Sequence, residues 1–380
     1  MNSRTRVRTA LAHEEPDRPP IGFFAIDYDT VERVLGRPTY VRAKAKCQIA
    51  FWEGRRDEVV QSWIEDTIDL HRKLDVIDVL RIASPSIGFA PPRGYQPDPP
   101  RRIDETTWED RRGRVFKLSE VTGDITCVHD PEQWTRVYRE EDFDPEAPVT
   151  PPDPSCFEAI DAVIAALADD FVILGPEGGE AAWVLLGGME RGLYEFAANP
   201  QVVKRAIRCA VNRANQLDEH TIRPGQDGVM WGTDFADKNG PLISPAMFRA
   251  FCLPGLIERT RRLHERGQVV FKHACGNNWK LLDMFCEAGF DGYQSIQESA
   301  GMDLAEVKRR YGDRLTLWGG VQVEHLVSGT TDDVRHDVRR ALQTAASGGG
   351  FILGTTHSVA VGTKYDNFMA MLDEFARLTA

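Results

Sequence analysis

The sequence predicts an α/β fold in which eight parallel strands, each followed by a helix, close into a (β/α)8 barrel of the TIM type. Short apolar runs recur along the 380 residues, and each precedes a turn residue and a longer segment with helical periodicity. Strands that alternate with helices form parallel sheets, and eight such units favour a closed barrel over the alternative, an open doubly wound sheet. The eight runs are residues 21–24, 76–82, 171–174, 228–231, 269–271, 292–296, 315–318 and 351–353.

Helix signals support this order of elements. Ser244 followed by Pro245 predicts a helix start, with apolar positions continuing to Leu263 and with Gly267 ending the segment before the next strand. Residues 331–333, Thr-Asp-Asp, predict another helix that ends near the glycines at 348–350.

One segment, residues 91–154, breaks the alternation and is dense in Pro and Arg. Two pieces of alternating polarity within it, 114–118 and 125–128, predict a β-hairpin. We therefore expect a single barrel domain over residues 1–380, with 91–154 inserted between the second and third strands.

Composition narrows the class of partner. The chain carries 46 Lys and Arg against 58 Asp and Glu, for a net charge of -12. This balance disfavours nucleic acid or an anionic membrane as the main partner, so a small molecule or a protein is expected. Its seven cysteines follow no disulfide pattern, and the sequence has no apolar stretch of the roughly 20 residues that a membrane span needs. We expect a soluble, cytoplasmic protein.

A metal-binding pattern stands at the end of the fifth predicted strand. His273 and Cys275 are separated by one residue, and side chains two apart in an extended segment point to the same side. Imidazole nitrogen and thiolate sulfur are both good zinc ligands, and catalytic zinc sites use three protein ligands and leave one position open. A buried cysteine beside a structural histidine is the alternative interpretation of this spacing.

The loop after the eighth strand offers the third ligand. His357 lies there, at the barrel face where active sites are found, and we predict that it completes the site with His273 and Cys275. A loop histidine that caps a helix or binds substrate is the alternative. Cys286 lies in a helical segment and is expected to pack in the core.

Other polar residues follow the predicted strands at the same face. Glu177 and Asp234, after the third and fourth strands, are predicted as catalytic groups, although loop carboxylates also cap helices. The predicted substrate-binding residues come from the loops after strands one, five and six, the last of which carries both Gln294 and Gln297. They are Asp27, Tyr28, Asn277 and Gln297.

Several motifs together resemble the uroporphyrinogen decarboxylase superfamily over nearly the whole chain. An entry segment at residues 4–7 and 15–20 is followed by matches spaced along the barrel. These are Gly175-Pro176, Ile243-Ser244-Pro245, His273-x-Cys275-Gly276-Asn277, residues 301–304 (Gly-Met-Asp-Leu), residues 317–320 (Leu-Trp-Gly-Gly), and Gly354-x-x-His357 followed by Asn367.

The resemblance implies one of two chemistries, porphyrinogen decarboxylation or corrinoid-linked methyl transfer at a zinc site. The His-x-Cys motif is similar to the methyltransferase branch, and residues 23–28 lack the arginines that the decarboxylase branch uses for porphyrin carboxylates. Asp27 and Asp29 stand there instead and would repel a polyanion. His357 replaces the third cysteine of the methyltransferases, which puts a thiol acceptor in doubt.

We therefore expect a zinc-dependent methyltransferase component of a corrinoid-linked methyl transfer or O-/N-demethylation system. Zinc would activate the heteroatom of a small methylated donor or a thiol acceptor. The chain has no Asp-x-His-x-x-Gly pattern, so the corrinoid is expected on a partner protein. The alternatives are a metal-independent carboxy-lyase of uroporphyrinogen decarboxylase type and, behind it, a non-catalytic binding barrel.

Overall fold

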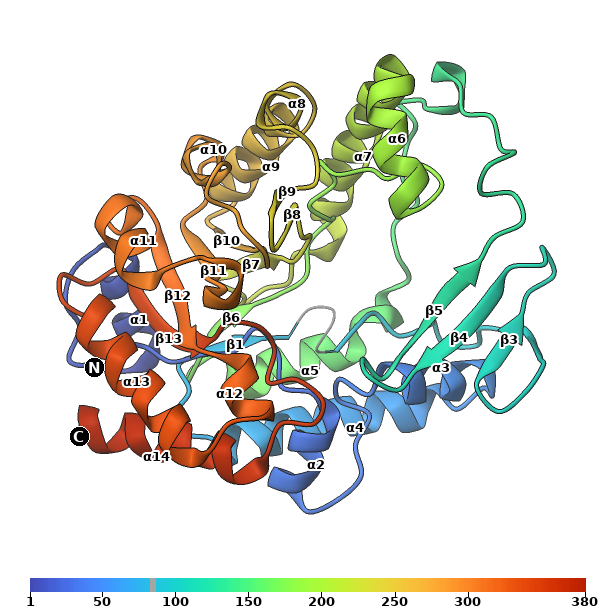
Figure 1. Ribbon diagram of the computed structural model, residues 1–380. Coiled ribbons are helices and arrows are strands. Elements are labelled where there is room, and N and C mark those ends of the chain that lie inside the picture. The colour runs from blue at the N-terminus through green and yellow to red at the C-terminus, as the bar shows by residue number, and fades with distance from the viewer. Residues whose placement is uncertain (83–86) are drawn as a thin grey trace.

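The computed structural model describes residues 1–82 and 87–380, and its centre is a curled, fully parallel sheet. Seven strands form this sheet in the order β1-β6-β7-β10-β11-β12-β13 (Figure 1). The order follows the chain, as expected when each strand is joined to the next by a helical crossover. The strands are β1 (Val79–Arg81), β6 (Val172–Leu174), β7 (Gly228–Trp231), β10 (Val269–His273), β11 (Gly292–Ser295), β12 (Thr316–Val321) and β13 (Phe351–Thr355).

The first predicted strand, 21–24, differs from the expectation. Instead of a regular strand, isolated parallel bridges join Ile21 to Leu353 of β13 and Gly22 to Val79 of β1. Close packing explains the irregularity, because a Cβ at Gly22 would lie 2.8 Å from the Trp318 ring, and the Trp318 indole donates to the Gly22 carbonyl at 3.0 Å. The segment nevertheless lies between the two edge strands of the curled sheet.

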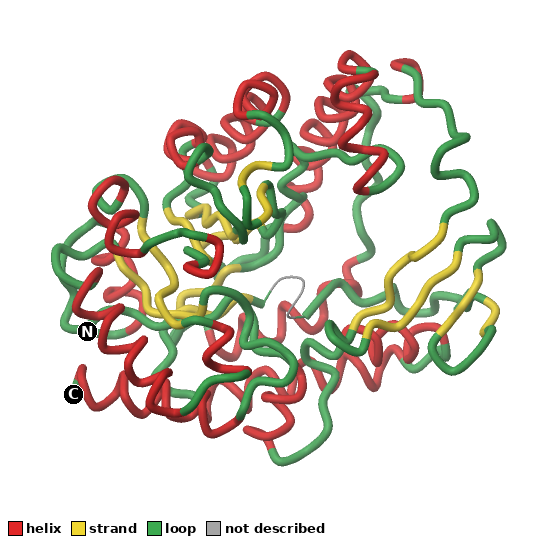
Figure 2. Tube along the Cα trace, in the orientation of Figure 1, coloured by secondary structure: helices red, strands yellow, loops and turns green. Residues whose placement is uncertain are grey.

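Helices cover the outside of the sheet, as Figure 2 shows by secondary structure. Ser244 caps α8 as predicted, but Pro254 lies in the first turn of a second helix, so the predicted single helix is two. Thr330 and Asp333 form a capping box at the start of α13. The helices are α1 (Ser3–Leu11), α2 (Tyr28–Leu35), α3 (Lys44–Trp52), α4 (Arg56–Lys73), α5 (Glu158–Leu167), α6 (Met189–Ala198), α7 (Pro200–Thr221), α8 (Pro245–Phe251), α9 (Leu253–Glu265), α10 (Leu282–Ala288), α11 (Leu304–Tyr311), α12 (Val323–Val327), α13 (Thr331–Ala345) and α14 (Tyr365–Thr379), with short 3-10 turns η1 (Glu140–Asp142), η2 (Pro154–Phe157) and η3 (Glu298–Ala300).

A separate antiparallel sheet lies between β1 and β6 in the chain. Where the sequence indicated two strands, the structure has four in the order β2-β3-β4-β5, and β4 pairs with β5. This sheet extends to the right of the parallel sheet in Figure 1, beside α3. Its strands are β2 (Arg101–Arg102), β3 (Thr107–Glu109), β4 (Val115–Ser119) and β5 (Asp124–His129), and a two-stranded ribbon follows β7, with β8 (Ala236–Asp237) and β9 (Gly240–Pro241).

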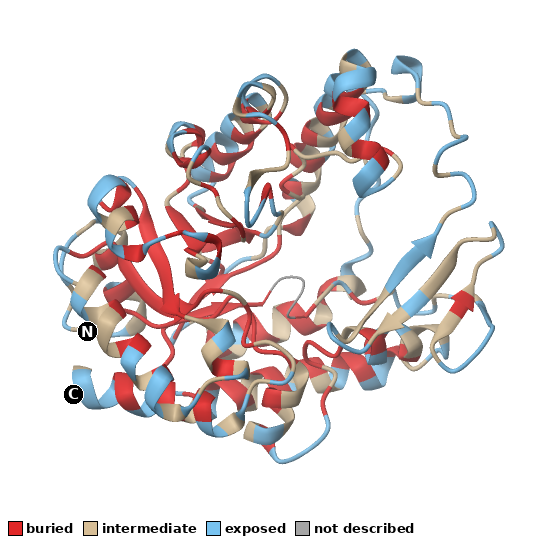
Figure 3. Ribbon diagram, viewed as in Figure 1, coloured by how far each residue is buried: buried red, intermediate tan, exposed pale blue. Residues whose placement is uncertain are grey.

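The core has two layers. Figure 3 shows the strands of the parallel sheet buried, whereas the outer helix faces and much of the antiparallel sheet are exposed. An inner cluster that includes Phe24, Phe271 and Trp318 fills the curl of the sheet, and a larger cluster lies between the strands and the helices. Among the described helices, none combines the length and the apolar character needed to cross a lipid bilayer.

Candidate metal centre and substrate cleft

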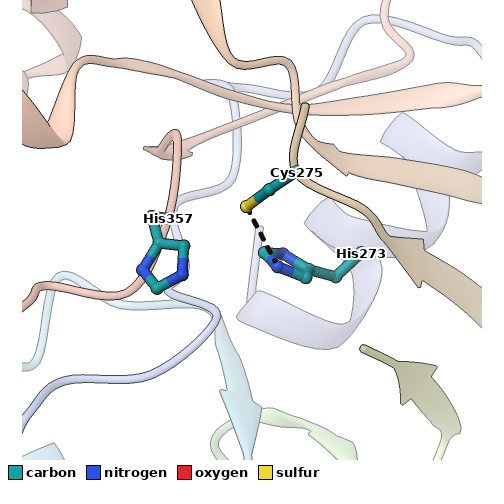
Figure 4. A group of neighbouring side chains, drawn as sticks. All are labelled: His273, Cys275 and His357. Carbon is teal, nitrogen blue, oxygen red and sulfur yellow. Dashed lines mark hydrogen bonds between the residues drawn. The ribbon is translucent and has the colours of Figure 1, made fainter. Parts of the chain in front are cut away.

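His273 and Cys275 come together at the carboxyl end of β10. His273 is the last residue of the strand and is almost fully buried, while Cys275 follows two positions later. The Sγ atom of Cys275 lies 3.4 Å from Nε2 of His273 (Figure 4). Two tetrahedral zinc ligands with a Zn–N bond of about 2.0 Å and a Zn–S bond of about 2.3 Å are about 3.5 Å apart, so this pair fits zinc.

His357 reaches the same point from the loop after β13. One ligand atom from each of His273, Cys275 and His357 lies within 4.8 Å of the other two. Figure 4 shows the three side chains directed toward one another from two parts of the chain. The structure thus brings together all three residues predicted as ligands, and this donor set suits a zinc ion with an open fourth position.

Gln294 of β11 orients the His273 ring. Its Nε2 donates to the Thr355 carbonyl at 2.8 Å, so its Oε1 faces His273 and accepts a hydrogen bond from Nδ1. Nδ1 therefore carries the proton, and Nε2, the nitrogen beside Cys275, keeps the lone pair that a metal requires. From the sequence, Gln294 was expected only to be a polar residue at the end of the sixth strand, with no assigned role.

Ser295, the next residue, also points to the site although neighbouring strand residues normally point to opposite faces. Its φ of 107° lies in the left-handed region that non-glycine residues rarely adopt. This backbone lets its Oγ donate to the Thr356 carbonyl at 2.6 Å and contact Sγ of Cys275 at 3.5 Å. The strained residue thereby joins the cysteine to the segment that carries His357.

Burial keeps the two imidazoles neutral and the thiol protonated. It lowers the pKa values of both His273 and His357. Both rings are therefore neutral, and neutral imidazole is the form that binds metals. Burial, with the nearby Asp234 carboxylate as the next cause, raises the pKa of Cys275 to about 12. A buried thiolate is unfavourable unless a cation accompanies it, so metal binding here requires the loss of a proton.

Asp234 and Glu177, the predicted catalytic acids, occupy different environments. Asp234 accepts the Cys275 amide at 2.7 Å, and the same oxygen lies 3.9 Å from Nε2 of His273, with the side chain half-exposed. Glu177 lies 3.5 Å from Arg259 and accepts the Gly179 amide. Burial raises the pKa of Glu177, which favours a proton-holding carboxyl.

A buried ion pair, not foreseen from the sequence, lies next to His273 in the chain, beside the candidate metal centre. Nζ of Lys272 contacts Glu180 at 2.7 Å and donates to the Thr233 carbonyl at 2.6 Å, and the Lys272 side chain is fully buried. The charge of Lys272 inside an apolar strand was the available sequence signal, because lysine is rarely buried unless paired.

A cleft of about 610 Å³, a size typical of small-molecule sites, opens beside these groups at the carboxyl ends of the strands. The antiparallel sheet supplies part of one wall. Lining residues include His273, His357, Asp234, Glu177, Glu180, Phe24, Phe89, Trp231, Arg42, Lys44, Arg81, Thr122, Asp124 and Thr126.

The four residues predicted to bind substrate make local contacts. Asp27 precedes α2 and accepts a hydrogen bond from Arg42 at 2.6 Å. Tyr28 makes a cation–π contact with Lys46, whose Nζ lies 4.8 Å from the ring centroid. The Asn277 side chain accepts the Trp279 amide at 3.4 Å, and Gln297 accepts the Gly276 amide at 2.9 Å. Their binding of substrate stays a prediction.

A curled parallel α/β sheet with a cleft and a metal-ligand group at its carboxyl edge defines the class of barrel-type α/β proteins that carry their sites on strand-end loops. The chain belongs to the uroporphyrinogen decarboxylase family: the family model "Uroporphyrinogen decarboxylase (URO-D)" matches residues 129–378, more than half of its length.

Two individual proteins extend this comparison. A uroporphyrinogen decarboxylase from Xylella fastidiosa is 26% identical over 155 residues, which span 38% of this chain and 42% of that relative. The chain thus matches less than half the length of this relative. A methyltransferase from Methanosarcina mazei has a solved structure that aligns over 100% of both chains with a TM-score of 0.65 and 18% identity. This likeness shows a shared fold.

Proposed function

We propose that this protein is the zinc-dependent methyltransferase component of a corrinoid-linked methyl transfer or demethylation system. The observation that carries the proposal is the convergence of His273, Cys275 and His357, whose ligand atoms lie within 4.8 Å of one another. Zinc bound there would supply Lewis acidity to the heteroatom of a methyl donor or to a thiol acceptor. A decarboxylase that needs no metal has no use for such a group.

The surrounding residues suit the proposed reaction. Gln294 fixes the tautomer of His273, and Ser295 holds Cys275, so the ligands are preorganised. Glu177 lines the cleft, and because its pKa is raised by burial it can deliver a proton to a departing phenoxide or amine. Asp234, at 3.9 Å from His273, stabilises positive charge at the ligand group.

The methyl acceptor in the demethylation direction would be a reduced corrinoid on a partner protein. The chain has no corrinoid-binding pattern of the Asp-x-His-x-x-Gly kind, which supports a separate carrier. The donor would be a small methylated compound such as a phenyl methyl ether or a methylated amine.

A metal-independent carboxy-lyase is the second candidate, and one structural observation favours it. The two acids expected to repel a polyanionic substrate are engaged elsewhere, because Asp27 pairs with Arg42 and Asp29 accepts the Gly362 amide at 2.7 Å. The electrostatic argument against such a substrate is therefore weaker than the sequence suggested.

The first experiment is the zinc content of protein purified without chelator. We expect about one zinc per chain in the wild type and loss of zinc in His273→Ala and Cys275→Ser. Cys286→Ser is the matched control, because Cys286 lies in α10 and should leave the zinc content unchanged.

Methyl transfer is then assayed with free cob(I)alamin as acceptor and a panel of phenyl methyl ethers and methylated amines. Loss of cob(I)alamin absorbance that depends on Cys275 supports the proposal. A folded wild type that takes up no zinc on reconstitution, or full turnover by Cys275→Ser, would contradict the zinc-dependent methyltransferase and make the carboxy-lyase the favoured function.

A further inference from the structure

Arg42 is held in the cleft wall with one donor group unused. Its side chain is 5% exposed, Nε donates to Asp27 at 2.6 Å, and Nη2 donates to the Ser358 hydroxyl at 2.9 Å. The remaining nitrogen, Nη1, is buried and has no hydrogen-bond partner among the residues that the structure describes. Leaving a charged donor buried and unsatisfied is energetically unfavourable.

The backbone at Arg42 is also unusual. Its φ is 61°, in the left-handed region, and backbone strain of this kind is concentrated at functional sites. The loop between α2 and α3 thus maintains both backbone strain and an unsatisfied guanidinium nitrogen where Arg42 lines the cleft.

A second guanidinium approaches the same cleft from β1. Arg81 lies over the Phe24 ring, 4.2 Å from its centroid, and that ring stacks on His273 with a centroid distance of 3.8 Å. Burial, followed by the charge of Arg42, lowers the pKa of Arg81 to about 9, and the Glu177 carboxylate offsets only part of this effect. The two buried cations therefore interact unfavourably, and an anion between them would relieve this repulsion.

Both arginines line the cleft close to the candidate metal ligands. Arg42 bonds to Ser358, the residue after His357, whereas Arg81 is separated from His273 by the Phe24 ring. A molecule that binds both guanidiniums therefore lies beside the ligand group.

Acids in the same wall are already engaged. Glu180 pairs with Lys272 at 2.7 Å, and Asp124 pairs with Lys44 at 2.7 Å. Asp234 accepts the Cys275 amide at 2.7 Å and lies 3.9 Å from Nε2 of His273. The arrangement leaves the Arg42 side of the cleft as the place where negative charge is accepted.

We propose that Arg42 and Arg81 form a carboxylate-binding subsite, and that the substrate is a small methylated carboxylic acid held by its carboxylate beside the metal centre. The identity of the bound compound as a methyl donor rests on the proposed function, whereas the subsite itself rests on the two arginines. Arg42 would donate to the carboxylate from Nη1, the nitrogen that Asp27 and Ser358 leave unused, and the charge of Arg81 would strengthen the binding.

Binding to metal-free protein tests the subsite separately from the methyltransferase reaction. Benzoate, its neutral isostere benzamide and inorganic phosphate are titrated calorimetrically. We expect benzoate to bind at least tenfold more tightly than benzamide and more tightly than phosphate. Equal binding of benzoate and benzamide would overturn the subsite, and phosphate binding as tight as that of benzoate would overturn its assignment to carboxylates.

Variants assign the site to Arg42. Arg42→Lys keeps a positive charge for Asp27 but loses the Nη1 donor, and we expect benzoate affinity to fall at least tenfold with zinc content unchanged. Arg37→Lys is the matched control, since Arg37 pairs with Asp66 and Asp69 away from this cleft. Unchanged benzoate affinity in Arg42→Lys would overturn the inference.

The outcomes also separate this inference from the proposed function. Arg42-dependent benzoate binding in a protein that takes up no zinc would leave the subsite standing and discard the methyltransferase. Zinc uptake and methyl transfer, combined with equal binding of benzoate and benzamide, would support the methyltransferase and discard the carboxylate-binding subsite.

Discussion

Gln294 accepts a hydrogen bond from Nδ1 of His273, and this contact determines which ring nitrogen is available to a metal. The amide cannot turn over freely, because its nitrogen donates to the Thr355 carbonyl at 2.8 Å. Gln294 on β11 thus connects β10 with β13. His273 and Cys275 lie at the end of β10, and His357 lies in the loop after β13.

Replacing Gln294 should weaken metal binding. In Gln294→Leu, Nδ1 loses its acceptor, so the ring is free to rotate or change tautomer, and we expect the zinc Kd to rise by about 10–100-fold. Gln294→Glu retains an acceptor and should stay closer to the wild type. Competition with a chromophoric chelator measures the affinity, and the visible bands of cobalt-substituted protein report ligand geometry.

Gln226→Leu is the control for this effect. Gln226 is also buried and hydrogen-bonded, to Gln268 at 2.8 Å, but it lies away from the metal centre. Its loss should lower the Tm without changing the zinc Kd. An equal loss of affinity in both variants would mean that Gln294 acts only through general stability.

Ser295 offers a direct test of backbone strain. Ser295→Ala and Ser295→Gly both lose the bond to the Thr356 carbonyl, but only glycine relaxes a φ of 107°. We expect the glycine variant to be more stable than the alanine variant by about 1 kcal/mol, the reverse of the usual order in a strand. Urea unfolding of metal-free protein measures the difference, and an alanine variant of equal or greater stability would contradict the strain.

The sequence was sufficient to bring the three candidate ligands together, but it did not reveal the residues around them. His273 and Cys275 were predictable because side chains two apart on a strand share a face, and His357 because all strand ends of a barrel meet at one edge. Gln294 and Ser295 act together only because Ser295 departs from the alternation of strand side chains, which no periodicity reveals.

The fold was predictable to a similar extent. Seven of the eight apolar runs overlap the strands of the parallel sheet, whereas residues 21–24 form isolated bridges because Trp318 packs against Gly22. Arg42 was missed because its position depends on a left-handed loop residue. Lys272 was detectable as a charge in an apolar strand, but its partner Glu180 lies 92 positions away in the chain.

Zinc binding should release one proton per chain near neutral pH. Burial raises the pKa of Cys275 to about 12, so the free thiol is protonated, while the lowered pKa values of both histidines leave them neutral. Only the thiol then loses a proton, so zinc affinity should rise about tenfold per pH unit from roughly pH 7 to 9.

Calorimetry in buffers of different ionisation enthalpy counts these protons. In Cys275→Ser the release should fall toward zero, since serine keeps its proton or does not bind. Release of no proton by the wild type would exclude thiolate ligation, and release of two would require a further protonated ligand.

Removing one partner of the buried Lys272–Glu180 pair should lower the free energy of unfolding far more than removing both charges. Lys272→Met leaves Glu180 without its 2.7 Å partner in a buried site, which is expected to destabilise the metal-free protein by roughly 3–5 kcal/mol. The double variant Lys272→Met, Glu180→Gln removes both charges and should recover a large part of this loss. Guanidinium unfolding of both single variants and the double variant gives the coupling free energy. A double variant whose destabilisation equals the sum of the two single effects would show that the pair does not interact, and that Lys272 is held at the end of β10 by the Thr233 carbonyl and by packing alone.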